Sequence, residues 1–263
     1  MLVLRALTHE TTGGIVAAAT TSMPELRGGH RNWDYRYVWL RDAALTLTVL
    51  PSHGYELEAG DWRASVLRAV AGDPDDVQIM CGLAGERYLP ERELTSLPGY
   101  RGSEPLRLGN GAVDQFQSDV IGEVMVALHA ARESGVAETE FSWQLQRTLA
   151  GFLEQNWSRP DQGIWEVRGP ARESTHSRVM VRAAFDRLVR GATEFGLPGP
   201  VERRTRLRDE VRFEIEERGF YRARNSYTQD FGGDEADTSL LVLPPGSASA
   251  TRRTRGCSAR SPR

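Results

Sequence analysis

The sequence contains no lysine, so all 33 of its basic residues are arginine, and it contains only two cysteines. Cys81 and Cys257 lie far apart and lack the spacing of metal ligands, which argues against a disulfide framework and against a zinc site. We expect one of them to be a buried small apolar side chain and the other an exposed thiol. No metal ion and no cofactor is predicted.

Long apolar runs are missing as well. No stretch approaches the roughly 20 apolar residues of a membrane helix, and the opening MLVLRALTHETTGG lacks the apolar core of a signal peptide. We therefore expect a cytoplasmic protein without a membrane partner. The formal net charge of −3 gives no support for a nucleic-acid partner. The oligomeric state stays open.

Apolar residues recur at helical spacing through most of the chain. They predict helices at 114–134, 138–156, 175–195 and 200–218, with two further helices at about 40–52 and 55–72. Long loops containing glycine and proline separate them at 73–113, 157–174 and 219–236, and a short strand or hairpin is expected around 77–81. This pattern indicates an all-α protein whose functional residues lie on loops held by rigid helices.

The start of the 114–134 helix leaves two roles open for its polar residues. Asp114, Gln115 and Asp119 either cap the helix or face a functional cavity, and Asp114 is the candidate N-cap. The acidic run at 73–76 is predicted to be a solvated turn and not a calcium site.

Two tryptophan-containing stretches carry the chemistry: GGHRNWDYRYVWLRDAAL at 28–45 and GIWEVRGPARESTHSRVM at 163–180. Each places an indole beside charged groups, which suits stacking on a sugar ring while polar groups hold its hydroxyls. Glu166 follows Trp165, and a carboxyl against an indole is a candidate for a raised pKa and for a glycosidic general acid. For His176 we favour a hydrogen-bonded structural role over a place in the pocket.

Residues 246–263 differ in composition from the rest of the chain. They contain five arginines and four serines and no acidic or aromatic residue, so they cannot build a core. Two explanations stay open, a disordered basic tail and the translation of a G- and C-rich gene in the wrong frame, and we favour the second.

Four long stretches together resemble bacterial glycoside hydrolase family 15, the glucoamylase, glucodextranase and trehalase-like enzymes. They are GGHRNWDYRYVWLRDAALTL, CGLAGERYLPERELTSLPGYRGSEPLRLGNGAVDQFQSDVIGEVMVALH, WSRPDQGIWEVRGP and THSRVMVRAAFDRLVR. The resemblance implies an (α/α)6 barrel, often preceded by a β-sandwich domain that we do not expect here. With six helices and the start of a seventh at 236–243, we predict a partial barrel, about its first half. The predicted domains are a partial catalytic domain at 1–245 and the tail at 246–263.

The same resemblance assigns the candidate site residues. Glu166 would be the general acid, Trp165 would shape its pocket, and Arg168 would hold either the sugar or a neighbouring carboxylate. Arg41 and Asp42 would grip the hydroxyls of the terminal glucose. Trp39 would line the pocket.

The implied activity is inverting, exo-acting hydrolysis of α-glucosidic bonds in an α-glucan, an oligosaccharide or trehalose. An inverting enzyme needs a second carboxylate about 6.5–9.5 Å from the first. By the resemblance this general base is a glutamate in the C-terminal part of the barrel, which we expect to lie beyond this chain. Two alternatives remain: a catalytically inactive remnant that binds sugar at most, and an N-terminal piece of a fuller protein. The choice among glucoamylase, trehalase and glucodextranase specificity is open.

Overall fold

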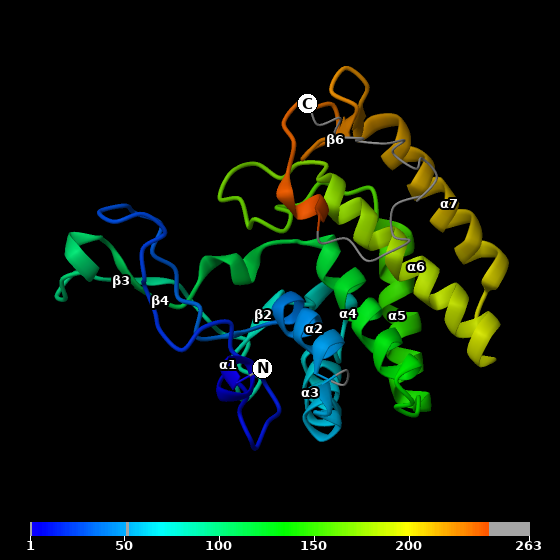
Figure 1. Ribbon diagram of the computed structural model, residues 1–263, viewed down its shortest axis with the longest axis horizontal. Helices are drawn as coiled ribbons and strands as arrows, with labels where there is room; N and C mark the ends of the chain where they lie inside the picture. The colour runs from blue at the N-terminus through cyan, green and yellow to red at the C-terminus, as the bar shows by residue number, and fades with distance from the viewer. Residues whose placement is uncertain (1, 51–52, 242–263) are drawn as a thin grey trace, which may run out of the picture.

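The computed structural model describes residues 2–50 and 53–241, apart from the side chains of 56–58. Within these residues the all-α prediction is confirmed (Figure 1). None of the helices in 2–50 and 53–241 has the length and apolar content needed to cross a membrane. The predicted tail at 246–263 lies outside the described residues, as does Cys257, whereas Cys81 is buried as one of the two cysteines was expected to be.

Within the described residues every α-helix except the short α1 forms where the apolar periodicity predicts one. Their bounds are α1 Leu2–Ala6, α2 Leu40–Val49, α3 Glu56–Ala69, α4 Ser118–Glu133, α5 Glu140–Asn156, α6 Thr175–Phe195 and α7 Val201–Arg218. The α6 bounds coincide with the predicted range, since Gly196 adopts a left-handed φ of 67° and ends the helix as a glycine C-cap does. Within 236–241, the described part of the expected seventh helix, there is only a 3-10 turn, Thr238–Leu241.

The start of α4 differs from the prediction. The helix begins at Ser118, and Asp114 instead ends a separate 3-10 turn, Gly111–Asp114. The side chain of Asn110 caps that turn by accepting a hydrogen bond from the amide of Ala112 at 3.0 Å. The assignment of Asp114 as the N-cap of α4 is therefore wrong, because the polar residues before the helix form a turn of their own.

The core lies where α4 packs between α2 and α6, and α6 in turn packs on α7 (Figure 1). Val120, Val124 and Leu128 of α4 are buried, as their four-residue spacing predicted. Gly122 permits the close approach of α4 to α6, because a Cβ there would lie 2.3 Å from the carbonyl oxygen of Met180. On α5 Leu145 and Leu149 are buried, whereas Phe141 is 63% exposed.

Short antiparallel strand pairs hold the connecting loops. The pairs are β1 Val38–Trp39 with β2 Met80–Cys81, β3 Arg92–Leu94 with β4 Leu106–Leu108, and β5 Phe220–Tyr221 with β6 Ser226–Tyr227. The strand expected around 77–81 is confirmed as β2, which pairs Met80 with Trp39 and Cys81 with Val38. Because β1 leads directly into α2, this pairing fixes the positions of Trp39 and the first turn of α2.

Candidate active site

A cavity of about 990 Å³ lies among the loops before α2, after β4 and between α5 and α6. All of the sequence-predicted site residues line it, namely Trp39, Arg41, Asp42, Trp165, Glu166 and Arg168. They come from β1, from the first turn of α2 and from the loop between α5 and α6. The fold therefore brings together side chains that lie more than 120 residues apart, such as Arg41 and Glu166.

The Glu166 carboxyl is held from one side. Its Oε1 accepts hydrogen bonds from the indole Nε1 of Trp39 at 2.6 Å and from Nη2 of Arg41 at 3.0 Å. Among the described residues no donor reaches Oε2, so this oxygen is available to a ligand in the cavity. The sequence predicts that Trp165 lies against Glu166, but the indole that hydrogen-bonds Glu166 is that of Trp39.

The backbone at Glu166 adopts a conformation that side chains rarely take. Its φ is 53°, in the left-handed region, on a turn in which its amide donates to the carbonyl oxygen of Gly163 at 3.0 Å. Nε2 of Gln115 supports the turn by donating to the carbonyl oxygens of Glu166 and Val167 at 3.2 and 3.3 Å. Such strained residues cluster at functional sites, where the surrounding structure holds them in place.

Burial raises the pKa of Glu166 above its ordinary value, while the charge of Arg41 and the bonds from Trp39 and Arg41 oppose that rise. The side chain is only 16% exposed, so the charged form loses much of its hydration. A carboxyl in this environment holds its proton to a higher pH than a free glutamic acid, as a general acid must.

Arg41 and Asp42 differ in how far the protein already engages them. Arg41 is buried, and its guanidinium donates to Glu166, to Oε1 of Gln117 at 2.9 Å and to Oδ2 of Asp119 at 3.4 Å. Asp42 is exposed on the cavity wall, and no described side chain forms an ion pair with it. Asp42 is thus the free hydrogen-bonding group of the pair.

Trp165 and Arg168 form the rim of the cavity. Trp165 is 51% exposed, and its Nε1 donates to both carboxylate oxygens of Asp237 at 3.0 and 2.8 Å. Arg168 donates to Oε2 of Glu91 at 3.0 Å and to Oδ1 of Asn110 at 2.8 Å. Of the two partners foreseen for Arg168, the structure therefore shows a neighbouring carboxylate.

Sequence reasoning missed other parts of the cavity wall. Trp33 lies under two guanidinium groups, with its ring centroid 4.5 Å from Cζ of Arg107 and 4.4 Å from Cζ of Arg168. The aromatic run at 33–39 signals this wall, because alternate residues of an extended segment share a face. Nothing in the sequence signals Asp237, which lies 72 residues from the Trp165 side chain that it orients.

The residues with open roles near α4 separate in the structure. Asp114 is exposed and is not part of the cavity wall, Gln115 supports the Glu166 turn, and Asp119 is buried beneath Arg41. His176 is fully buried and does not line the cavity. Its expected hydrogen bonds are absent, since neither ring nitrogen has a hydrogen-bond partner among the described residues.

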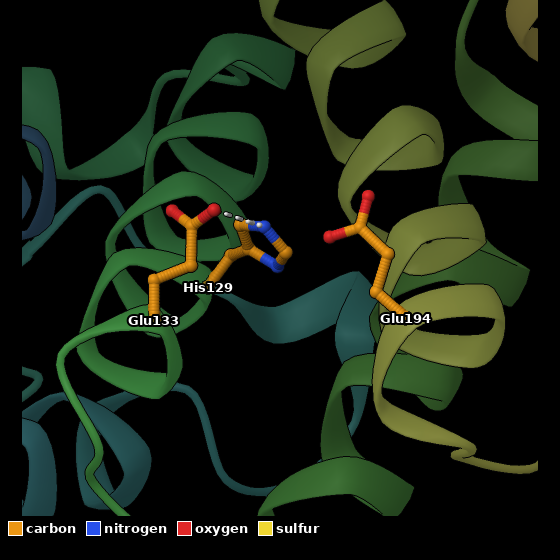
Figure 2. A group of neighbouring side chains, drawn as sticks. All are labelled: His129, Glu133 and Glu194. Atoms are coloured by element: carbon orange, nitrogen blue, oxygen red, sulfur yellow. Dashed lines mark ion pairs between the residues drawn. The ribbon is translucent and has the colours of Figure 1, made fainter.

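Within 2–50 and 53–241, one group of side chains has the donor types of a metal site. His129 and Glu133 of α4 and Glu194 of α6 place their ligand atoms within 4.8 Å of one another, and Figure 2 shows them converging between the two helices. Arg190 already binds both carboxylates. It donates to Glu133 at 2.7 Å and to Glu194 at 2.8 and 2.9 Å.

The protonation of His129 also argues against a metal. Nη1 of Arg132 lies 3.1 Å from Nδ1 of His129, and arginine only donates, so Nδ1 must be the acceptor. The neutral ring then carries its hydrogen on Nε2, the atom that faces Glu133 at 3.5 Å, and has no lone pair there for an ion. Burial lowers the pKa of His129 to about 4, so the ring is neutral near pH 7. The group is better described as an ionic clamp between α4 and α6.

Solved structures with related folds are glycosidases. The chain matches a glycosidase solved in complex with glucose with a TM-score of 0.69 at 17% identity, covering 94% of this chain and 62% of that one. It matches a glucoamylase from Saccharomycopsis fibuligera with a TM-score of 0.58 at 12% identity, covering 87% and 49%. At these identities the likeness shows the fold, a helical barrel of which this chain forms a part.

Sequence relatives are closer. The chain is 37% identical to a trehalase of Thermoplasma volcanium over 92% of its own length and 39% of the relative's. It is 36% identical to a trehalase of Mycobacterium tuberculosis over 92% and 36% of the two chains. The chain thus spans less than half the length of these curated relatives. The model of the family described as glycosyl hydrolases family 15 matches residues 1–253, and the chain belongs to that family.

Proposed function

We propose that this chain carries the general-acid part of an inverting, exo-acting hydrolase of α-glucosidic bonds. The observation that supports this most is the Glu166 carboxyl, which is nearly buried at the wall of a 990 Å³ cavity with one oxygen held and the other free. Oε2 would deliver the proton to the glycosidic oxygen, while Trp39 and Arg41 hold Oε1 in position.

The rest of the cavity suits a terminal glucose unit. The free carboxylate of Asp42 would accept hydrogen bonds from sugar hydroxyls, and the half-exposed ring of Trp165 would stack on a sugar face. Asp237 holds that ring by its Nε1. Trehalose is the favoured substrate over α-glucans and maltooligosaccharides, because the relatives at 36–37% identity are trehalases.

The general base needs a separate source. Besides Glu166, the carboxyl groups of the cavity wall are Glu25, which pairs with Arg31 at 2.9 Å, and Asp42, to which we assign the sugar hydroxyls. We infer that the base comes from the part of the relatives' length that this chain does not span, so that residues 1–245 supply part of a catalytic domain. Inversion places that base on the far side of the sugar from Glu166.

Glu166→Gln tests the general acid in a version that spans the full length of the relatives. We expect kcat/KM for trehalose to fall about 10³-fold, within the usual range for losing a general acid. Activated aryl α-glucosides should lose far less, because their leaving groups need no proton. Glu133→Gln is the matched control, since it removes a carboxylate from α4 outside the cavity.

An equal loss on both substrates would contradict the acid role of Glu166. A proton NMR spectrum of the first product tests inversion, since an inverting enzyme releases β-glucose from an α-glucoside. If a full-length version binds glucose or trehalose by calorimetry but hydrolyses neither trehalose nor maltooligosaccharides, the alternative of an inactive sugar-binding remnant replaces the proposal.

A further inference from the structure

Arg41 is shared between two carboxylates, one on α4 and one on the loop before α6. Its Nη2 contacts Glu166 at 3.0 Å, and its Nη1 contacts Asp119 at 3.4 Å. Gln117 fixes the orientation of the guanidinium by accepting from the same Nη1 at 2.9 Å. The arginine is buried, so water screens neither contact strongly.

Among the described residues Arg41 is the one side chain that donates a hydrogen bond to Asp119. Asp119 is completely buried in the first turn of α4, and its Oδ1 has no hydrogen-bond partner among the described residues. Burial raises the pKa of Asp119, whereas the charge of Arg41 and the free amides at the start of α4 oppose the rise. A buried carboxylate of this kind depends on its one cation.

Behind Asp119 lie His176 and Glu123, and neither of these side chains adds a charge near pH 7. His176 places Nδ1 3.8 Å from Oδ2 of Asp119 and Nε2 3.9 Å from Oε1 of Glu123. Burial lowers the pKa of His176 to about 4 and raises that of Glu123 to about 8, so both are neutral there. The described titratable and charged groups around Arg41, Asp119 and Glu166 come from several elements. They are Tyr35, Arg41, Asp42, Asp119, Glu123, Asp161, Glu166, His176 and Asp237.

We propose that Asp119 is a positioning residue for the general acid, because it divides the Arg41 guanidinium between itself and Glu166. The inference rests on the proposed function of Glu166. The charge of Asp119 offsets part of the charge of Arg41, and it also repels a negative charge on Glu166. Both effects favour the protonated form of Glu166, the form that can donate to a glycosidic oxygen.

Asp119→Asn tests this directly in the 263-residue chain. The amide is nearly isosteric and uncharged, so Arg41 becomes fully available to Glu166. We expect the titration midpoint of Glu166 to fall by about one pH unit. The measurement is the side-chain carboxyl carbon shift of Glu166 by carbon-13 NMR, with the resonance assigned by its loss in Glu166→Gln.

Gln117→Glu gives the opposite sign and keeps the test decisive if Asp119→Asn does not fold. It places a second carboxylate 2.9 Å from Nη1 of Arg41, so the Glu166 midpoint should rise. Asp114→Asn is the matched control, because Asp114 is exposed on the preceding turn and should leave the midpoint unchanged.

The consequence for turnover is specific to proton donation. In a version that spans the relatives' length, the alkaline limb of kcat/KM for trehalose should move down by the same amount in Asp119→Asn, while aryl α-glucosides with good leaving groups show little change. A Glu166 midpoint that stays fixed in both folded variants, or moves equally in Asp114→Asn, overturns the inference. Because the NMR titration needs no turnover, an inactive protein would count against the proposed function and leave this result readable.

Discussion

The two ends of α4 carry similar side chains in different states of satisfaction. At its C-terminal end Arg132 donates to Glu138, to Gln146 at 3.1 Å and to Nδ1 of His129 at 3.1 Å, and Nε2 of His129 has no hydrogen-bond partner among the described residues. At its N-terminal end Oδ1 of Asp119 has no hydrogen-bond partner among the described residues, nor has either ring nitrogen of His176. A buried network in which most polar groups have hydrogen-bond partners fixes how helices pack. Buried polar atoms without partners beneath a cavity instead indicate that the arrangement serves a site.

The largest expected effect on stability is at the C-terminal end of α4. Arg132→Met leaves the buried Glu138 with Arg63 as its remaining cation, at 2.8 Å, and also removes a guanidinium stacked 5.2 Å from the ring centroid of Trp143. Breaking a buried pair of this kind costs about 3–5 kcal/mol of unfolding free energy, which urea denaturation at pH 7 would measure. Arg212→Met is the control, because Arg212 and Glu216 are 40% and 42% exposed in their pair, and its loss should cost under about 1 kcal/mol. Equal losses of unfolding free energy in the two variants would show that the burial of the Arg132–Glu138 pair makes no difference to stability.

Near the N-terminal end of α4, Glu123→Gln is expected to stabilise the protein. Burial raises the pKa of Glu123 from 4.5 to about 8, so the unfolded chain releases this proton at a lower pH than the folded one does. Stability due to this group is therefore present below pH 4.5 and is lost as the pH rises toward 8. The variant cannot titrate and should be more stable than the wild type by about 2–4 kcal/mol at pH 8, with little difference at pH 4.

Denaturant unfolding of both proteins from pH 4 to pH 8 measures this difference. Glu133→Gln on the same helix is the control, since Glu133 is 47% exposed and should not reproduce the pH-dependent gain. If Glu123→Gln is less stable than the wild type at pH 8, the folded protein stabilises the ionised carboxylate of Glu123, and the prediction is wrong.

The smallest expected effect concerns the clamp shown in Figure 2. Zinc chloride at pH 7 should leave the unfolding temperature unchanged, because Arg190 already neutralises Glu133 and Glu194. An ion bound at ten times its Kd would stabilise the fold by about 1.4 kcal/mol, which differential scanning calorimetry detects. A zinc-dependent rise that disappears in His129→Gln would show that the ion displaces Arg190.

Much of the fold follows from local sequence pattern. The four-residue spacing of Met180, Ala184 and Leu188 predicts α6, and all three side chains are buried in it. The prediction failed at Asp114, where a polar residue before a helix can cap it or belong to another turn, and spacing does not distinguish the two. In the candidate site, the family resemblance identified Glu166, Arg41 and Asp42 as cavity residues, but it did not indicate what holds them.

The sequence by itself therefore determined most of the helices and their buried faces, because helical period is a local property. The family resemblance added part of the cavity wall. Only the tertiary structure decided which charges meet. Asp119 and Glu166 lie 78 and 125 residues from Arg41, and Asp237 lies 72 residues from Trp165. The path of the chain sets these contacts, and burial then sets the protonation of Glu166 and Glu123, since the loss of hydration depends on every element packed around a carboxyl group.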